Sequence, residues 1–156
     1  MANHIVLYQP QIPNNTGNIG RTCAATGSTL HLIHPLGFST DDKMLKRAGL
    51  DYWPHINVIH HDSAEAFFEA TEGNYYLLTK FATKPYTDVD FSNDDEAHYF
   101  IFGRETTGLP DWLKEQYGDN ALRVPITDKV RSLNLANTAA ILIYEALRQQ
   151  GFPHIN

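Results

Sequence analysis

The sequence predicts an α/β fold in which a mainly parallel sheet is flanked by helices. Short apolar runs that suit strands alternate along the chain with longer stretches that suit helices. The strand-like runs are apolar at nearly every position, so neither face of the sheet is expected to lie in water. This combination favours a sheet covered by helices on both sides, with ligands bound near the carboxyl ends of its strands.

The expected strands are rich in β-branched and aromatic residues. They span Ile5 to Tyr8, Leu30 to Ile33, Asn57 to His60, Tyr75 to Thr79, Tyr99 to Phe102 and Leu122 to Val124. The expected helices run from Gly17 to Thr26, Asp41 to Ala48, Ser63 to Ala70, Asp111 to Gln116 and about Asn134 to Gln150. At 156 residues, the chain fits one compact domain over residues 1–156 and is too short for two ordinary ones.

The final helix has the clearest pattern. One face carries Leu135, Ala139, Leu142, Ala146 and Gln149, and Gly151 and Pro153 end the helix. The other face is also apolar, so the helix either lies at the centre of the core or forms half of a subunit interface, and we favour a homodimer. On this helix, Tyr144 either packs in the core or interface, which we favour, or stacks on a base.

Composition excludes several classes of protein. Hydrophobic residues make up 42% of the chain, but no apolar run has the length of a membrane span, so no membrane partner is expected. The opening MANHIVLYQP lacks a basic start and a long apolar stretch, which argues against a signal peptide and for a cytoplasmic protein.

The net charge of −6, from 12 Lys and Arg against 18 Asp and Glu, opposes non-specific attraction to nucleic acid. Most of the basic residues, however, fall in or beside loops that follow strand-like runs, which allows a local basic face. The segment from Asp88 to His98 is most simply a solvated acidic loop.

Thiol and metal chemistry are not expected. Cys23 is the only cysteine and lies in an apolar helical segment, so we interpret it as a small buried hydrophobe rather than a nucleophile. His55, His60, His61 and His98 lack the spacing of metal ligands, and we predict no metal.

Three loops carry the residues suited to chemistry. The first, PQIPNNTGNIGRTCAATG, follows the first strand and opens a helix that Asn15 or Thr16 would cap. It lacks the spacing of a dinucleotide fingerprint and the ending of a P-loop. In this loop, Arg21 is either an exposed helix residue or a functional one.

The second loop, IFGRETTGLP, runs from a strand through Gly103 and Gly108 to the next helix, with Glu105 and Thr106 beside the first glycine. A structural turn of this composition is the alternative. The third loop, RVPITDKVRSLNLANTAA, precedes the final helix. Its Ser132 is either a helix cap or a ligand-binding residue.

In their order, the three loops resemble the motifs of the SPOUT methyltransferase superfamily. NNTGNIGR is similar to the first motif, FGRETTGLP to the second and VPITDKVRSLNLANTAAILIYEA to the third, and the similarity covers almost the whole chain. The short length, the opening IVLYQPQIPNNTGNIGRTCAATG and DYW after KMLKRAGL are most similar to the tRNA (cytidine/uridine) 2'-O-methyltransferases of the wobble nucleotide.

The resemblance implies a SPOUT fold with a deep C-terminal trefoil knot, which departs from the general rule that chains are unknotted. It also implies an obligate homodimer, the cofactor S-adenosyl-L-methionine and a ribose 2'-hydroxyl in the tRNA anticodon loop as the target. The cofactor site carried over from the family consists of Leu78, Thr79, Gly103, Val124, Ile126, Ser132 and Leu133. The catalytic group carried over consists of Arg21, Asn15, Glu105, Ser132 and Asn134.

A guanidinium holds its proton too tightly to be an easy general base. We therefore hypothesise that Arg21 binds the adjacent phosphate and stabilises negative charge on the ribose oxygen, while a phosphate or water takes the proton. The residues expected to hold the RNA backbone are Lys43, Lys46, Arg47 and Arg131. For the first three, an exposed helix face is the alternative.

Two other functions remain open at this point. A related SPOUT enzyme could act on another tRNA position or on ribosomal RNA. A non-catalytic RNA-binding dimer could keep a cofactor pocket, although the set Asn15, Arg21, Glu105, Ser132 and Asn134 favours an enzyme.

Overall fold

The computed structural model describes residues 2–41, 43, 47 and 52–156, and it contains a six-stranded sheet. The strands lie in the order β3-β2-β1-β5-β4-β6, and each pairs with its neighbours in parallel. They are β1 (Asn3–Tyr8), β2 (Thr29–Ile33), β3 (Val58–His61), β4 (Asn74–Leu78), β5 (His98–Phe102) and β6 (Ala121–Leu122). The predicted α/β fold with a parallel sheet is therefore confirmed.

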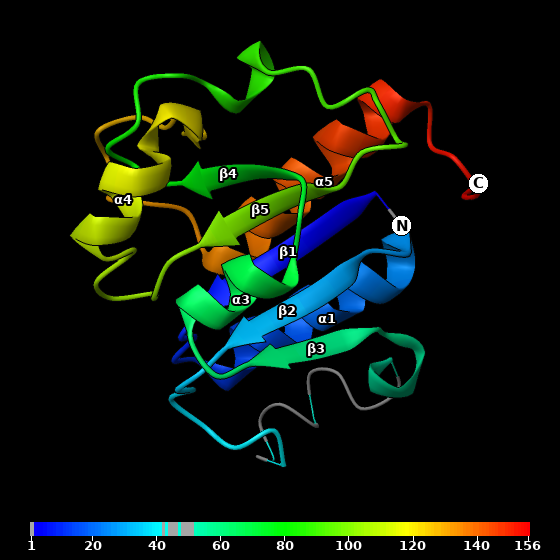
Figure 1. Cartoon of the computed structure of the whole chain (residues 1–156), viewed down its shortest axis with the longest axis vertical. Helices are drawn as coiled ribbons and strands as arrows, with labels where there is room; N and C mark the ends of the chain where they lie inside the picture. The colour runs from blue at the N-terminus through cyan, green and yellow to red at the C-terminus, as the bar shows by residue number, and fades with distance from the viewer. Residues whose placement is uncertain (1, 42, 44–46, 48–51) are drawn as a thin grey trace.

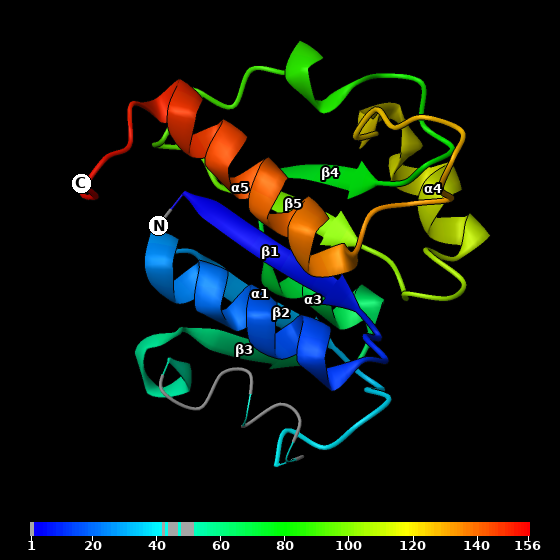
Figure 2. The same ribbon diagram turned by 180° about the vertical axis from the view of Figure 1, so that it is seen from behind.

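Helices cover both faces of the sheet. On one face, α1 (Pro13–Thr26) and α5 (Leu135–Gln150) lie side by side, and α3 (Ala64–Ala70) covers the other (Figures 1 and 2). The helix α4 (Asp111–Tyr117) packs beside α3 through Leu113 and the stacked rings of Phe68 and Tyr117. Single 3₁₀ turns form η1 (Trp53–His55), η2 (Tyr86–Asp88) and η3 (Gly118–Asn120).

The alternation of side chains along each strand divides the core between these two layers. On β1, Ile5 and Leu7 pack with the α1 and α5 layer, whereas Val6 and Tyr8 pack with the α3 and α4 layer. All four are buried. The central strands β1, β2, β4 and β5 are buried at most positions because both of their faces are covered, whereas the edge strand β3 is largely exposed.

The sheet has a point at which the chain changes direction across it. The chain moves outward from β1 to β2 and β3, and then returns on the other side to β4 and β5, so β1 and β5 are neighbours. The connections that leave their carboxyl ends diverge, and a crevice opens at such a point in parallel α/β sheets.

The start of α1 differs from the prediction. The helix begins at Pro13 rather than Gly17, and Ile12 is its N-cap residue, without a side-chain cap. Asn15 and Thr16 do not cap the helix, because they lie inside its first turns and are buried. Proline suits the first helical position, since its missing N–H would have no partner there.

The final helix follows the prediction closely. Asn134 is the N-cap residue of α5 and its side chain accepts hydrogen bonds from the backbone N–H groups of Ala136 and Asn137. Ser132 is therefore not the cap. Gly151 ends the helix in the left-handed conformation at φ 79°. The helix buries Ala139, Leu142, Ile143, Ala146 and Leu147 and leaves Tyr144 46% exposed.

The acidic segment from Asp88 to His98 is more than a solvated loop. Phe91 is fully buried in the core, although the neighbouring carboxylates are exposed. Gln149 donates from Nε2 to the carbonyl of Val89 at 3.0 Å, and Gln150 donates to the carbonyl of Phe91 at 2.9 Å. Hydrogen bonds from the end of α5 thus hold this segment in place, with Phe91 in the core.

Histidines on three neighbouring strands form a row under α3. Nδ1 of His4 lies 2.9 Å from Nε2 of His31, and Nδ1 of His31 lies 2.9 Å from Nε2 of His61. Burial and the neighbouring imidazoles lower the pKa of His31 to about 3. No helix in the described part of the chain has both the length and the apolarity to cross a membrane.

Candidate functional site

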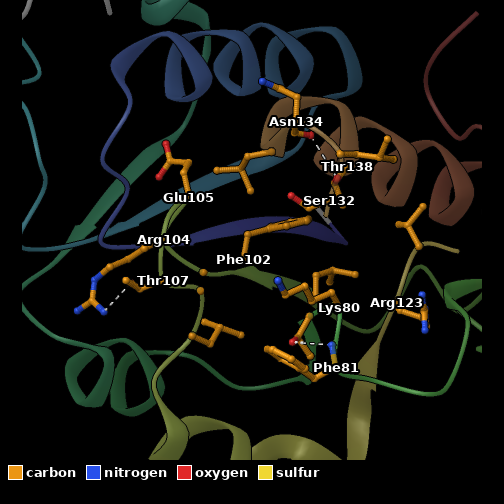
Figure 3. Close-up of a pocket in the computed structure, with 18 of the residues that line it drawn as sticks. Lys80, Phe81, Phe102, Arg104, Glu105, Thr107, Arg123, Ser132, Asn134 and Thr138 are labelled. Atoms are coloured by element: carbon orange, nitrogen blue, oxygen red, sulfur yellow. Dashed lines mark hydrogen bonds between the residues drawn. The ribbon is translucent and has the colours of Figure 1, made fainter. Parts of the chain in front are cut away.

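A pocket of about 690 Å³ lies at the carboxyl ends of β4, β5 and β6 (Figure 3). The loops after these strands form its walls, and the starts of α1 and α5 close it through Ile12, Asn15 and Asn134. Pockets of about 300 to 1,000 Å³ hold ligands of the size of a nucleoside derivative. The pocket is therefore where the parallel sheet predicts a ligand.

All the residues expected at a cofactor site line this pocket. They are Leu78, Thr79, Gly103, Val124, Ile126, Ser132 and Leu133. They come from four separate stretches of sequence, which are the end of β4, the loop after β5 and two parts of the segment between β6 and α5. The wall combines apolar side chains with loop backbone, and the backbone N–H of Thr79 is already engaged by the carbonyl of Leu122 at 3.0 Å.

Glu105 joins two of the loops. Its carboxylate accepts hydrogen bonds from the backbone N–H of Gln11 at 2.9 Å and of Ile12 at 2.8 Å. Asn15 also donates from Nδ2 to the same carboxylate at 3.4 Å. A carboxylate at this position satisfies backbone donors before the first turn of α1 and suits the positive end of the helix.

Asn15 extends the network to the third loop. Its Oδ1 accepts a hydrogen bond from Nδ2 of Asn134 at 3.1 Å, while Oδ1 of Asn134 caps α5. The three loops thus meet through Glu105, Asn15 and Asn134. Ser132 lines the same pocket beside Asn134 and is exposed (Figure 3).

The second loop is closed on itself. Arg104 and Gly108 exchange backbone hydrogen bonds at 3.1 and 2.9 Å. A side chain at Gly103 would place its Cβ 2.3 Å from the carbonyl carbon of Gly108, so only glycine fits this turn. The hydroxyl of Thr106 donates to Oε1 of Gln11 at 2.7 Å, which fixes the loop against the first one.

Arg21 does not join this network within one chain. It lies six residues after Asn15 on α1, which turns its side chain about 240° around the helix axis. Its guanidinium lies 4.8 Å from the ring centroid of Tyr52, is exposed, and is not among the residues that line the pocket. Arg21 is the one expected catalytic residue that the chain alone does not bring to the others.

Of the residues expected to hold RNA, Lys43, Arg47 and Arg131 are not among those that line the pocket. Lys43 and Arg47 are exposed, and Arg131 is exposed directly before Ser132. Lys46, together with most of the helix expected from Asp41 to Ala48, lies outside the described residues.

Basic residues that the sequence did not assign to the site also line the pocket, in keeping with the local basic face that their positions beside strand ends allowed. Lys80, Arg104, Lys114 and Arg123 line it, against the single carboxylate of Glu105. The pocket is thus locally cationic in a chain of net charge −6. Lys80 and Phe81 follow the expected strand that ends at Thr79, so their position after a strand end was a signal that could have identified them.

The remaining reactive groups are placed away from this chemistry. Cys23 is 1% exposed, as expected for a small buried hydrophobe, and burial raises the pKa of its thiol to about 12. Within the ranges that the structure describes, no three His, Cys, Asp or Glu side chains are grouped so that they could hold a metal ion.

The fold and the pocket can be compared with those of known protein families. The model of the SpoU rRNA Methylase family matches residues 2–144, and the chain belongs to this family. A protein of Methylovorus glucosotrophus named tRNA (cytidine(34)-2'-O)-methyltransferase is 48% identical over 95% of this chain and 96% of its own length. A Bacillus subtilis protein to which the same activity is provisionally assigned is 63% identical over 97% and 96%.

Solved structures agree with this family. A crystal structure from Bacillus anthracis, provisionally described as an RNA methyltransferase, superposes with a TM-score of 0.94 at 61% identity, over 99% of this chain and 98% of that one. A structure reported for the 2-OH methylation of C/U34 on tRNA superposes with a TM-score of 0.88 at 43% identity, over 96% and 91%.

Proposed function

We propose that this chain, as a single domain of residues 1–156, transfers a methyl group from S-adenosyl-L-methionine to the ribose 2'-hydroxyl of nucleotide 34, the wobble position of tRNA. The observation that carries the proposal is the hydrogen-bonded group of Asn15, Glu105 and Asn134 beside the pocket, in a chain whose relatives bear that activity in their names.

The pocket fits S-adenosyl-L-methionine in size and in chemistry. Leu78, Val124 and Leu133 offer apolar side chains on which an adenine ring packs, and the loops at Gly103 and Ile126 offer backbone groups. When bound, the cofactor supplies an electrophilic methyl group. The close turn at Gly103 supports this assignment, because it holds the loop that lines the pocket against its own backbone at Gly108 and Leu109.

The residues around the pocket orient the ribose. Asn15, Glu105, Ser132 and Asn134 place donors and acceptors along one side, and holding a hydroxyl in line with a methyl donor supplies much of the acceleration in a transfer reaction. Arg21 binds the adjacent phosphate and stabilises negative charge on the ribose oxygen, and a phosphate or water accepts the proton.

The anticodon loop suits this site because its unstacked nucleotides can enter a pocket, and the 2'-hydroxyl distinguishes RNA from DNA. The cationic lining from Lys80, Arg104, Lys114 and Arg123 supports an RNA substrate despite the net charge. In this proposal Lys43, Lys46, Arg47 and Arg131 bind the RNA backbone. The proposal includes a cytoplasmic location, which a tRNA substrate supports.

The active form in this proposal is a homodimer. Arg21 lies outside the pocket of its own chain, which supports an arrangement in which each chain completes the pocket of the other. On α5, Tyr144 is 46% exposed and Ala140 and Ile141 are half-buried, so apolar surface remains for a subunit interface.

The proposal includes the C-terminal knot. The connection between β4 and β5 contacts the segment that leaves β6 through two backbone hydrogen bonds. The backbone N–H of Arg123 donates to the carbonyl of Lys84 at 2.9 Å, and the carbonyl of Arg123 accepts from the backbone N–H of Tyr86 at 2.9 Å. The same connection contacts the end of α5 through Gln149 and Gln150. These contacts support a terminal segment that threads through this connection.

The test is methyl transfer from labelled S-adenosyl-L-methionine to unmodified tRNA, followed by mapping of the methylated nucleotide. Methylation of the 2'-oxygen at nucleotide 34 is expected, with no product on a 2'-deoxy-34 substrate. Methylation at another tRNA position or on ribosomal RNA would replace the proposed target. Tight RNA binding without transfer would favour the non-catalytic dimer.

The role of Arg21 has its own test. An Arg21→Lys variant keeps the charge but loses the planar fork that grips phosphate, so lower turnover or weaker tRNA binding is expected. Undiminished turnover with unchanged tRNA affinity would exclude the bidentate role.

A further inference from the structure

Phe81 presents an aromatic ring to solvent at the rim of the pocket. It is 72% exposed, more than any other large apolar side chain that the structure describes. The loop holds it there, because its backbone N–H donates to Oγ1 of Thr79 at 3.2 Å and the next residue, Ala82, is buried. The ring therefore contributes almost nothing to the core.

Two ammonium groups accompany this ring. Nζ of Lys80 lies 5.3 Å and Nζ of Lys114 lies 5.2 Å from its centroid. Lys114 comes from α4, where it also contacts Asp111 at 3.3 Å, so the ring lies between two elements of the fold. Figure 3 shows Phe81 and Lys80 on the same side of the pocket, across from Glu105 and Asn134.

An exposed aromatic ring with neighbouring cations is the arrangement by which proteins bind unpaired nucleotides. The flat face of the ring stacks on a base, and the cations contact its phosphate. The ring lies on the rim opposite the residues assigned to the ribose, so a nucleotide beside the target would reach it when the target enters the pocket.

We propose that Phe81 is a stacking platform for a loop base adjacent to the methylated nucleotide, with Lys80 and Lys114 contacting the phosphate of that base. This inference rests on the proposed function, since it names a further contact with the same RNA. Phe81 is a positioning residue in this account and does not touch the reacting atoms.

Steady-state methylation of an anticodon stem-loop tests the proposal with four variants. Phe81→Ala and Phe81→Leu are expected to raise the KM for RNA by about tenfold, because stacking on one aromatic ring is worth about 5- to 150-fold in binding. Phe81→Trp is expected to restore the KM. Phe152→Ala removes another exposed aromatic ring far along the sequence and is the matched control, with an unchanged KM.

A second measurement reads the stacking directly. Stem-loops that carry 2-aminopurine at each loop position in turn are titrated with the protein. Quenching at one position next to nucleotide 34 is expected with the wild type and with Phe81→Trp, and it is expected to vanish with Phe81→Ala.

Several results would overturn this inference while leaving the proposed function intact. One is an unchanged KM for RNA in Phe81→Ala while the wild type methylates nucleotide 34, and another is a wild-type KM in Phe81→Leu. The others are found in Phe81→Ala: a loss of S-adenosyl-L-methionine affinity without a change in RNA affinity, or a change in oligomeric state by sedimentation. Failure of the wild type to methylate nucleotide 34 would instead reject the proposed function.

Discussion

Asn134 donates a hydrogen bond from Nδ2 to Oδ1 of Asn15 at 3.1 Å, across 119 positions of sequence. The same Asn134 side chain caps α5 through its oxygen. One amide therefore holds the beginning of the last helix and the beginning of the first helix against each other at the pocket.

These two roles of Asn134 can be separated by substitution. Asn134→Ala is expected to lower the free energy of unfolding by about 1 kcal/mol through the lost cap, whereas Asn134→Ser keeps a cap and stays near the wild type. Both variants lose the donor to Asn15 and are expected to lower kcat for methyl transfer by about tenfold or more. Denaturant unfolding and single-turnover kinetics measure the two effects, and full turnover in Asn134→Ser would show that the contact with Asn15 is dispensable.

Glu105 is expected to be needed for the shape of the site. Glu105→Gln leaves one oxygen for the two backbone donors of Gln11 and Ile12, and a hydrogen bond to a charged acceptor is worth about 1.5 to 3 kcal/mol. We expect a stability loss of that order and a drop in kcat of about tenfold or more. The control is Glu115→Gln, which changes an exposed carboxylate on α4. Turnover of Glu105→Gln within about twofold of the wild type would contradict the role.

The turn at Gly103 is expected to tolerate no side chain. In Gly103→Ala the new Cβ would lie 2.3 Å from the backbone of Gly108, so the loop must move. We expect a loss of about 1 to 3 kcal/mol in stability and at least tenfold weaker binding of S-adenosyl-L-methionine by calorimetry. Gly118→Ala has open space at its Cβ and is the matched control, with neither property changed.

Mixed dimers distinguish the chain that Arg21 acts on. We expect Arg21→Ala and Asn134→Ala homodimers to be nearly inactive. If Arg21 completes the pocket of the other chain, a purified heterodimer of the two variants contains one intact site and recovers about half of the wild-type activity. An inactive heterodimer, measured with two affinity tags to exclude homodimers, would place Arg21 in the site of its own chain.

The histidine row makes stability depend on pH. His31 is held neutral, with a pKa of about 3 against 6.5 for an ordinary histidine. The unfolded state therefore binds a proton that the folded state does not, so the free energy of unfolding decreases as the pH falls below 6.5 toward 3. Between about pH 7.5 and pH 5, His31 alone accounts for about 2 kcal/mol.

Denaturant unfolding at the two pH values measures this loss. His31→Gln is expected to flatten the dependence, because the amide does not titrate. His55→Gln, at an exposed position in η1, is the control and is expected to leave the dependence as it is. An equally steep dependence in His31→Gln would assign the acid sensitivity to other groups.

The sequence alone was sufficient to predict the strands of the sheet, because parallel strands covered on both faces are continuously apolar and differ from the segments between them. Strand β3 shifted by only one residue from the expected range. The start of α1 was missed, since the amides of Gln11 and Ile12 directly before it are satisfied by Glu105 from a loop some 90 positions away, which no local pattern displays. Phe91 was missed for a similar reason, as its anchors lie on α5.

The site was predicted from family resemblance rather than from periodicity. Pocket residues such as Leu78, Val124 and Leu133 have no distinctive chemistry, and only the order of the strands brings them together. Phe81 was overlooked because its position after a strand end was its only signal in the sequence, and that signal does not show that the side chain is exposed beside two lysines. Arg21 was likewise named from the resemblance, and no local pattern indicated that it would lie outside the pocket of its own chain.

The hydrogen bonds among Asn15, Glu105 and Asn134 also determine when, during synthesis, the pocket can be completed. Asn15 is made at the start of α1, Glu105 directly after β5, and Asn134 only after all six strands. A chain in synthesis that has not yet reached α5 therefore has its strands but lacks the contact that Asn134 makes with Asn15. The proposed methyl transfer is thus expected to begin only after this last contact has formed.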